Sequence, residues 1–295
     1  MTPTGTDERA RGLAFALAAY LSWGMLPLYF KALHPVPAPE ILAHRVLWSL
    51  VLLAALLAVR GGAAAFRVPF RRDKLPLLAL TTTLITVNWL VYIWAVQVGR
   101  VLEASLGYFV NPLVNVLLGV AFLGESLSRR QKLAVALAAL GVAVLIVRAN
   151  TFPWVSLVLA TSFGLYGLLR KRAAIDAVGG LFGETALLAP AALAYLLFRA
   201  HAGTGAFGTG LGTSSLLAAA GAITALPLVW FTLGVHRLRL STMGLVQYVA
   251  PSGQFLLAVL LYREPFGRAH AAAFAFIWAS LALYSWEAFA RARSG

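Results

Sequence analysis

The long uncharged stretches of this chain decide what it can fold into. Five of them contain no Asp, Glu, Lys or Arg, namely 75–99, 104–124, 149–169, 202–236 and 240–262. A helix needs about 20 apolar residues to cross the hydrocarbon core of a bilayer, so each stretch can span a membrane once. A soluble helical domain would show polar faces at a period of 3.6 residues, and these stretches are apolar all round. The sequence therefore predicts an integral membrane protein.

Composition removes several classes of function. Apolar residues make up 61% of the 295 positions, and the chain contains no Cys, which excludes disulfides, thiolate metal sites and a cysteine nucleophile. The net charge of +14 does not indicate nucleic acid, because nearly all basic residues lie between the apolar stretches, where they orient helices. The expected partners are the lipid bilayer and a small-molecule substrate, with no nucleic acid, no metal and no cofactor.

Ten helices are expected along the chain. The proline-rich segment 34–39 cannot continue a helix, and the Gly- and Thr-rich segment 203–212 is the longest expected loop. The expected spans lie near 13–31, 39–59, 75–97, 102–123, 130–148, 152–169, 178–198, 214–235, 240–262 and 268–288.

An internal repeat connects the two halves of the chain. Three polar or proline positions recur without a gap at an offset of 139 residues: Arg100 with Arg239, Pro112 with Pro251, and Glu125 with Glu264. Apolar composition would not place charges and prolines in register by chance. A repeated unit of this size is typical of secondary transporters that build two gates around one site.

The distribution of basic residues predicts the orientation. With the N-terminus in the cytoplasm, the inner segments hold 17 basic residues and the outer segments hold 6, with Arg45 inside a span. Five spans per repeat is an odd number, so the second repeat must be inverted. The expected fold is therefore an all-α integral membrane protein of ten transmembrane helices arranged as two inverted five-helix repeats. The expected units are a cytoplasmic tail 1–11, repeats 12–148 and 149–288, and a cytoplasmic tail 289–295.

Several motifs resemble a known family. They are the segments 18–24, 41–49, 88–96 and 103–113, together with Glu184-Thr185, Pro190, and Gln247-Tyr248 before Pro251. These segments look like the EamA-type permeases of the drug/metabolite transporter superfamily, and their RarD branch in particular, over roughly residues 10 to 290. The resemblance implies a permease of the bacterial inner membrane with a central site between its halves. It implies no substrate, because such permeases carry chemically diverse solutes.

Two ionisable residues inside spans are the first candidates for a substrate site. Burying such a residue costs ~2.5–3.5 kcal/mol on insertion scales. Aligning Ser22-Trp23-Gly24 with Ser162-Phe163-Gly164 sends His44 to Glu184 and Arg45 to Thr185. In one interpretation Arg45 binds an anionic group of the substrate, and Glu184 binds an amine or carries a proton. In the other, Arg45 pairs with Glu40 or extends outward, and Glu184 caps a backbone group or extends inward.

Polar side chains on the spans 102–123 and 240–262 form a second set of candidates. Tyr108, Asn111 and Asn115 share one helix face, and the offset of 139 sends Tyr108 to Gln247 and Asn115 to Gln254. Such amides can bind a polar ligand or hold helices together, and their recurrence favours the ligand. Asn88 and Tyr92, one turn apart, form a similar pair in one copy. Trp23, Trp89, Trp94 and Trp230 can stack on a ligand, but interface positions are more typical of Trp.

Two further features concern motion and assembly. Pro112 and Pro251 each remove a hydrogen bond in the middle of a span, which gives a static kink or a hinge for alternating access. Ala271, Ala275 and Ala279 form a ridge of small residues that permits close packing within the chain or in a homodimer.

The predicted function is a secondary transporter that moves a small metabolite or drug-like solute by alternating access, with proton coupling left open. The alternatives are a channel and a polytopic membrane enzyme. An enzyme is disfavoured because the acids are scattered, the histidines have no ligand-like spacing, and no Gly-x-Ser-x-Gly turn occurs. Substrate, direction of transport, coupling ion and oligomeric state stay open.

Overall fold

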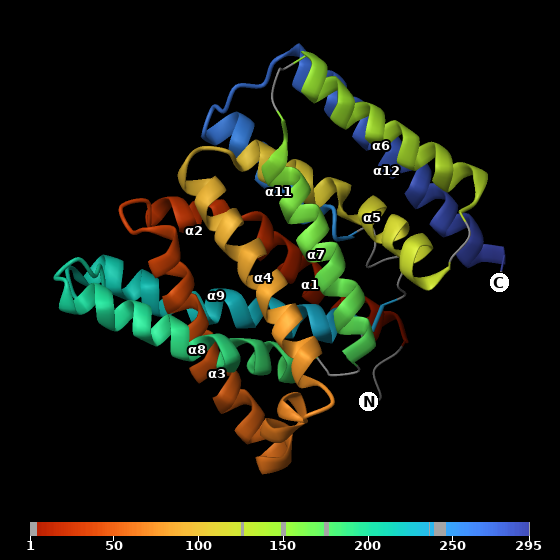
Figure 1. Cartoon of the computed structure of the whole chain (residues 1–295). Helices are drawn as coiled ribbons and strands as arrows, with labels where there is room; N and C mark the ends of the chain where they lie inside the picture. Colours follow the sequence, from red (N-terminus) through yellow and green to blue (C-terminus); the bar gives the residue numbers. More distant parts are fainter. Residues whose placement is uncertain are drawn as a thin grey trace.

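The computed structural model describes residues 5–124, 127–148, 152–173, 177–235, 237–238 and 246–294, and every regular element within these ranges is helical (Figure 1). Eight helices are long and apolar enough to cross a membrane, and two shorter apolar helices, Trp154–Arg170 and Val249–Leu261, accompany them. The chain is thus an all-helical, multi-pass membrane protein. Two anchors of the repeat, Glu125 and Arg239, lie outside the described residues.

The described part of the first half contains six α-helices and one 3-10 turn. They are α1 (Gly5–Gly24), α2 (Leu26–Ala32), α3 (Ala38–Arg67), η1 (Val68–Phe70), α4 (Leu75–Gln97), α5 (Val101–Leu123) and α6 (Arg129–Arg148).

The described part of the second half contains five α-helices and one π-helical turn. They are α7 (Trp154–Ala173), α8 (Ala177–His201), α9 (Leu211–Val235), α11 (Val249–Leu256), the π-turn η2 (Leu257–Leu261) and α12 (Arg268–Ser294).

Some helix boundaries differ from those expected from hydropathy. The span expected at 13–31 is two helices, because a break at Met25 is followed by Pro27 in the first turn of α2. Helix α3 continues beyond residue 59 to Arg67, and α12 continues beyond 288 to Ser294. These extensions are rich in Ala and Arg, which favour helix but lower the mean hydropathy at the end of a span.

The helices pack in a few extensive pairs. Helices α6 and α12 lie side by side at one edge of the molecule, while α3 packs against both α8 and α9 at the other (Figure 1). Between these groups, α5 and α4 pack against α7, and α1 packs against α9 and α11. The ridge Ala271, Ala275 and Ala279 is exposed on α12, because its opposite face, with Phe274 and Ile277, is buried.

Glycines allow two of these pairs to approach closely. A Cβ at Gly24 of α1 would lie 3.2 Å from the carbonyl oxygen of Ala250 in α11. A Cβ at Gly164 of α7 would lie 3.0 Å from a methyl group of Val114 in α5. Gly24 and Gly164 are the two glycines that the sequence aligns, so the pairs α1–α11 and α7–α5 cross at matching positions.

Candidate functional site

Arg45 is buried among aromatic side chains in the middle of the helix bundle. It lies seven residues into α3, about 10 Å from the start of that helix. Only 7% of the residue is exposed. Its Nε donates a hydrogen bond of 2.8 Å to Oγ1 of Thr224 on α9. Its guanidinium carbon lies 4.2 Å from the centroid of the Trp89 ring, and 5.9 Å from that of Phe30. Arg45 therefore links α3 to α9 and stacks on α4.

No carboxylate among the described residues pairs with Arg45. The six acidic side chains that the structure describes are Glu8, Glu40, Asp73, Glu103, Glu184 and Glu264, and all six accept bonds elsewhere. The suggested pair of Arg45 with Glu40 is wrong, because Glu40 binds Arg199 instead. A guanidinium buried without a counter-ion is costly, which makes this position unusual for a merely structural cation.

Aromatic rings continue from Arg45 toward α5. The Tyr92 ring lies 5.9 Å from the ring of Phe30, which the Arg45 guanidinium also contacts. The Tyr92 and Tyr108 rings are 5.6 Å apart, and the Tyr108 hydroxyl donates to Oδ1 of Asn88 at 3.3 Å. Asn88 in turn donates to the Leu159 carbonyl and to Ser162 Oγ, each at 3.0 Å. A polar chain thus runs from Tyr108 on α5 through Asn88 on α4 to α7.

We call Arg45, Asn88, Trp89, Tyr92 and Tyr108 the arginine site. Four of its five members are candidates from the sequence, and the fold brings them together. Trp89 was assigned an interface role, because nothing local shows that a residue of α3 stacks on it. The Tyr92 hydroxyl is buried and has no hydrogen-bond partner within the described structure, and the same holds for Oδ1 of Asn111, one turn after Tyr108 on α5. The site therefore retains unused polar capacity around one positive charge.

Glu184 lies apart from the arginine site. Its Oε2 accepts a hydrogen bond of 3.0 Å from the Tyr166 hydroxyl, and its Oε1 is 3.8 Å from Nη1 of Arg170. Both partners come from α7, so Glu184 ties α8 to that helix. His44, its sequence counterpart in the first repeat, stacks on Phe207 at 5.1 Å between ring centroids, and its Nε2 has no partner in the described structure.

The two polar stripes occupy different environments. Asn115 is exposed on α5, whereas its counterpart Gln254 is 2% exposed and donates to the Trp23 carbonyl at 3.2 Å. Gln247 is partly buried. Gln254 thus holds α11 against α1, as the helix-packing interpretation expects. Pro112 lies inside α5, which continues as an α-helix to Leu123, and Pro251 lies near the start of α11.

One end of the bundle is closed by carboxylates that join the two halves of the chain. Glu264 accepts the backbone N–H groups of Val101 and Leu102, at 2.8 and 2.7 Å, at the start of α5. Glu103 accepts the N–H of Val155 at 2.9 Å, at the start of α7, and also pairs with Arg100. The first amides of a helix have no partner within the helix, so a carboxylate there satisfies them and opposes the helix dipole.

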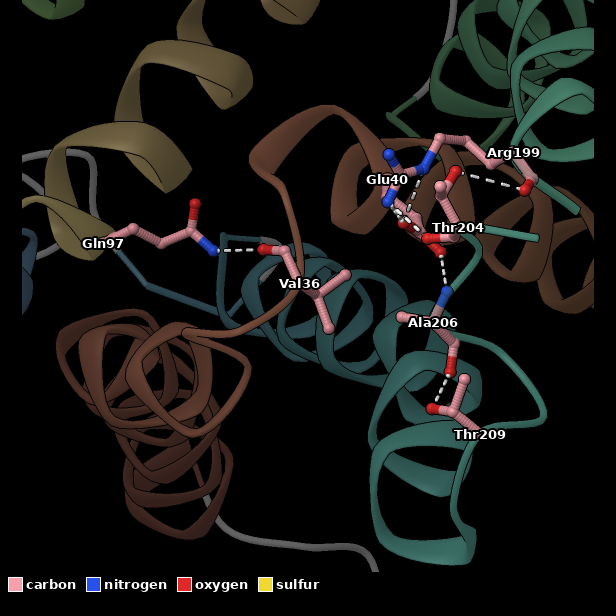
Figure 2. A network of polar contacts seen from close by, with 7 residues as sticks. All are labelled: Val36, Glu40, Gln97, Arg199, Thr204, Ala206 and Thr209. Carbon is pink, nitrogen blue, oxygen red and sulfur yellow. Dashed lines mark hydrogen bonds and ion pairs between the residues drawn. The ribbon is translucent and has the colours of Figure 1, made fainter. Parts of the chain in front are cut away.

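Glu40 makes the third such connection (Figure 2). Its Oε2 lies 3.1 Å from Nη2 of Arg199 on α8, and its Oε1 accepts the N–H of Ala206 at 2.5 Å. Arg199 also donates to the Thr204 carbonyl, so the loop between α8 and α9 folds over Glu40. We call the end of the bundle that carries Glu40, Glu103 and Glu264 the clasped end.

The partners of these three carboxylates do not follow from the sequence, which suggests Arg45 as the partner of Glu40 and none for Glu103 or Glu264. Glu264 was found as an anchor of the repeat, and Glu103 stands in the first turn of an expected helix, where acids are favoured. Burial raises the pKa of Glu264 above its ordinary value, and Glu103 raises it further, while the Leu102 and Val101 amides and Lys31 lower it.

Comparison with known proteins identifies relatives over almost the whole chain. Residues 10–147 match the model of the EamA-like transporter family. An "Uncharacterized transporter" of Vibrio cholerae is 48% identical over 287 residues, which cover 97% of this chain and 95% of that protein. "Protein RarD" of Salmonella typhi is 47% identical over 283 residues, covering 95% and 96%. A "Chloramphenicol-sensitive protein RarD" of Pseudomonas aeruginosa is 34% identical over 282 residues, covering 94% of each chain.

A solved chain described as "Crystal structure of protein" has a TM-score of 0.59 and 21% identity, and covers 93% of this chain and 96% of that chain. This likeness supports the fold alone. The sequence relatives carry more information, because their identity is high and continuous from end to end. They confirm the resemblance seen in the motifs, and the chain is a permease of the RarD branch of the EamA-like transporter family.

Proposed function

We propose that this protein is a secondary transporter that moves a small organic solute across the bacterial cytoplasmic membrane by alternating access. Its moving parts are the two five-helix repeats, residues 12–148 and 149–288, inverted relative to each other. Both termini and the segment 60–74 lie in the cytoplasm. The clasped end faces outward, because the segments there carry 6 of the basic residues and the opposite segments carry 17.

The packing of the helices supports two related repeats. With the shorter apolar helices Trp154–Arg170 and Val249–Leu261 counted as spans beside the eight longer ones, the proposal has ten spans. The pairs α1–α11 and α7–α5 correspond under the sequence repeat, and so do the pairs α1–α9 and α7–α4. An inverted repeat of this kind lets one half adopt the conformation of the other, which exchanges the open side.

The observation that carries the proposal is a buried, unpaired cation beneath an end that is closed across the two halves. Each contact of the clasp connects a residue of 12–148 with a residue of 149–288. A static pore has no reason to seal one end with contacts between its halves. A carrier must do so in one of its two states.

The experiment closes the clasped end covalently and asks from which side the interior can be reached. The chain has no native Cys, so introduced cysteines report without background. Lys31 Nζ lies 5.5 Å from the Tyr262 ring, and these residues belong to opposite halves. A bifunctional thiol reagent should bridge Lys31→Cys and Tyr262→Cys. Reporter cysteines at Asn111 and Asn115, in separate variants, are then labelled with an impermeant reagent in vesicles of either orientation.

We expect the bridged protein to be labelled only in inside-out vesicles, and reduction of the bridge to restore labelling in right-side-out vesicles. The matched control is the pair Val36→Cys and Gln97→Cys, which lies within the first half, where Gln97 donates to the Val36 carbonyl at 2.6 Å. Bridging that pair should leave two-sided labelling unchanged. Labelling of the bridged protein from both sides would contradict alternation and favour a channel.

A further inference from the structure

The arginine site has the charge of a receptor for one anion. Arg45, which carries the positive charge, is 7% exposed, and no carboxylate in the described part of the chain forms an ion pair with it. All six described carboxylates bind partners elsewhere. Without a ligand, the protein therefore holds an uncompensated charge between its helices, and a bound anion would remove that cost.

The geometry of the guanidinium favours a carboxylate. Its Nε is already bonded to Thr224, while no hydrogen bond occupies the two Nη nitrogens in the described structure. Those two nitrogens form a planar fork that matches the two oxygens of a carboxylate. The Tyr92 hydroxyl is a further donor without a partner in the part of the chain that the structure describes.

The surroundings favour an apolar body attached to that anionic group. The guanidinium stacks on Trp89, and the rings of Phe30, Tyr92 and Tyr108 continue the same aromatic surface. A second charge on the solute would find no described partner here, because Glu184 lies with Arg170 on other helices. A zwitterion or a dianion would therefore bring one charge that the site does not neutralise.

We propose that the substrate is a small organic monocarboxylate, whose carboxylate binds the Nη nitrogens of Arg45 and whose apolar or aromatic part lies against Trp89, Tyr92 and Tyr108. This inference rests on the proposed function, since it names the cargo of the same site.

The test measures binding rather than transport. The purified protein is heated with matched acid and amide pairs: butyrate and butyramide, benzoate and benzamide, phenylacetate and phenylacetamide. Ionic strength is held constant with NaCl, and inorganic phosphate and phenylalanine are added as a dianion and a zwitterion. At about ten times its dissociation constant a ligand should raise the unfolding temperature on the order of 3 °C. Each carboxylate should exceed its amide, the aromatic acids should exceed butyrate, and phenylacetate should exceed phenylalanine and phosphate.

Substitutions at Arg45 test whether its guanidinium is the group that recognises the negative charge of the ligand. Arg45→Gln should abolish the difference between acid and amide, while Arg71→Gln, which removes an exposed arginine, should keep it. If Arg45→Gln does not fold, Arg45→Lys keeps the charge without the fork, and should retain a smaller preference for the acid. An equal response to acids and amides, or an acid preference that survives Arg45→Gln, would overturn the proposal.

The binding test and the labelling test can refute the monocarboxylate ligand and the alternating-access mechanism independently. One-sided labelling of the bridged protein without any preference for acids would support the carrier mechanism and refute a monocarboxylate substrate. If the wild-type protein prefers acids, Arg45→Gln loses that preference, and the bridged protein is labelled from both sides, the ligand class is supported and alternating access is refuted.

Discussion

The two ends of the helix bundle are held in different ways. At the clasped end, three carboxylates accept backbone N–H groups across the two halves, through Glu40, Glu103 and Glu264. At the opposite end, the described contacts include ion pairs between side chains, such as Arg170 with Glu184 within the second half and Arg237 with Glu8, and the hydrogen bond from Tyr166 to Glu184. A carboxylate that caps a helix fixes both the position and the direction of its backbone, whereas long side chains tolerate displacement.

This comparison teaches where the energy barrier to opening lies. Charged hydrogen bonds contribute about 1.5–3 kcal/mol each, and partly exposed ion pairs about 0–1 kcal/mol. The clasped end must break several of the first kind in order to separate. Of the described ion pairs at the opposite end, Arg237–Glu8 is partly exposed, and Arg170–Glu184 has a buried carboxylate but a separation of 3.8 Å, which is beyond hydrogen-bond distance.

Glu264→Ala should have the largest effect. The substitution removes both acceptor oxygens, so the N–H groups of Val101 and Leu102 lose their partners at the start of α5. A loss of about 2 kcal/mol shifts the ratio of closed to open roughly 30-fold toward the open clasped end. The distance distribution between spin labels at Val98 and Leu211, two exposed residues of that end that belong to opposite halves, measures the shift. Asp73→Ala, which removes an exposed carboxylate, is the control, and an unchanged distribution in Glu264→Ala would refute the clasp.

Glu184→Gln should act in the other direction and less strongly. The substitution keeps an acceptor for the Tyr166 hydroxyl but removes the charge that faces Arg170. Losing about 1 kcal/mol at the opposite end leaves the clasped end closed and lowers thermal stability slightly. The same spin labels should report no opening. A shift toward the open clasped end in this variant would show that the two ends do not open independently, and would refute the difference drawn between them.

Among these changes, acidification should have the smallest effect on the ratio of closed to open clasped end. The pKa of Glu264 is raised in the closed state, mainly by burial, and returns toward its ordinary value when the clasped end opens to water. Protons therefore bind more tightly to the closed state. Closure should strengthen as the pH falls from above the raised pKa toward the ordinary one, and should change little at higher pH. Spin-label distances measured between pH 7.5 and pH 5 test the sign, and Glu264→Gln should remove the dependence.

The sequence predicted those features that depend on local composition. The helical class and the burial of Arg45 follow from apolar stretches that one charge interrupts, and the RarD-type motifs lie along continuous segments. These features need no knowledge of which helices are neighbours.

The contacts of the site could not be predicted in the same way. Thr224 lies 179 residues from Arg45, and Arg199 lies 159 residues from Glu40. Glu40 is closer in sequence to Arg45, which is why a pair one turn apart was considered. Gln254 and Asn115 occupy matching positions in the repeat, yet one is buried and the other exposed, because packing differs between the halves.

The π-helical turn η2 has a consequence for symmetry. Pro251 and Glu264 are separated by as many residues as Pro112 and Glu125, so the repeat aligns without a gap. Helix α5 nevertheless runs as a regular α-helix to Leu123, whereas Leu257–Leu261 forms a π-turn whose closing bond joins the Tyr262 N–H to the Leu257 carbonyl. A π-turn absorbs one extra residue, which corresponds to a rotation of roughly 100° for everything that follows. The angle at which Glu264 meets α5 is thus set by one turn of helix, and deleting a single residue of η2 would rotate the carboxylate away without changing the length of the chain beyond it.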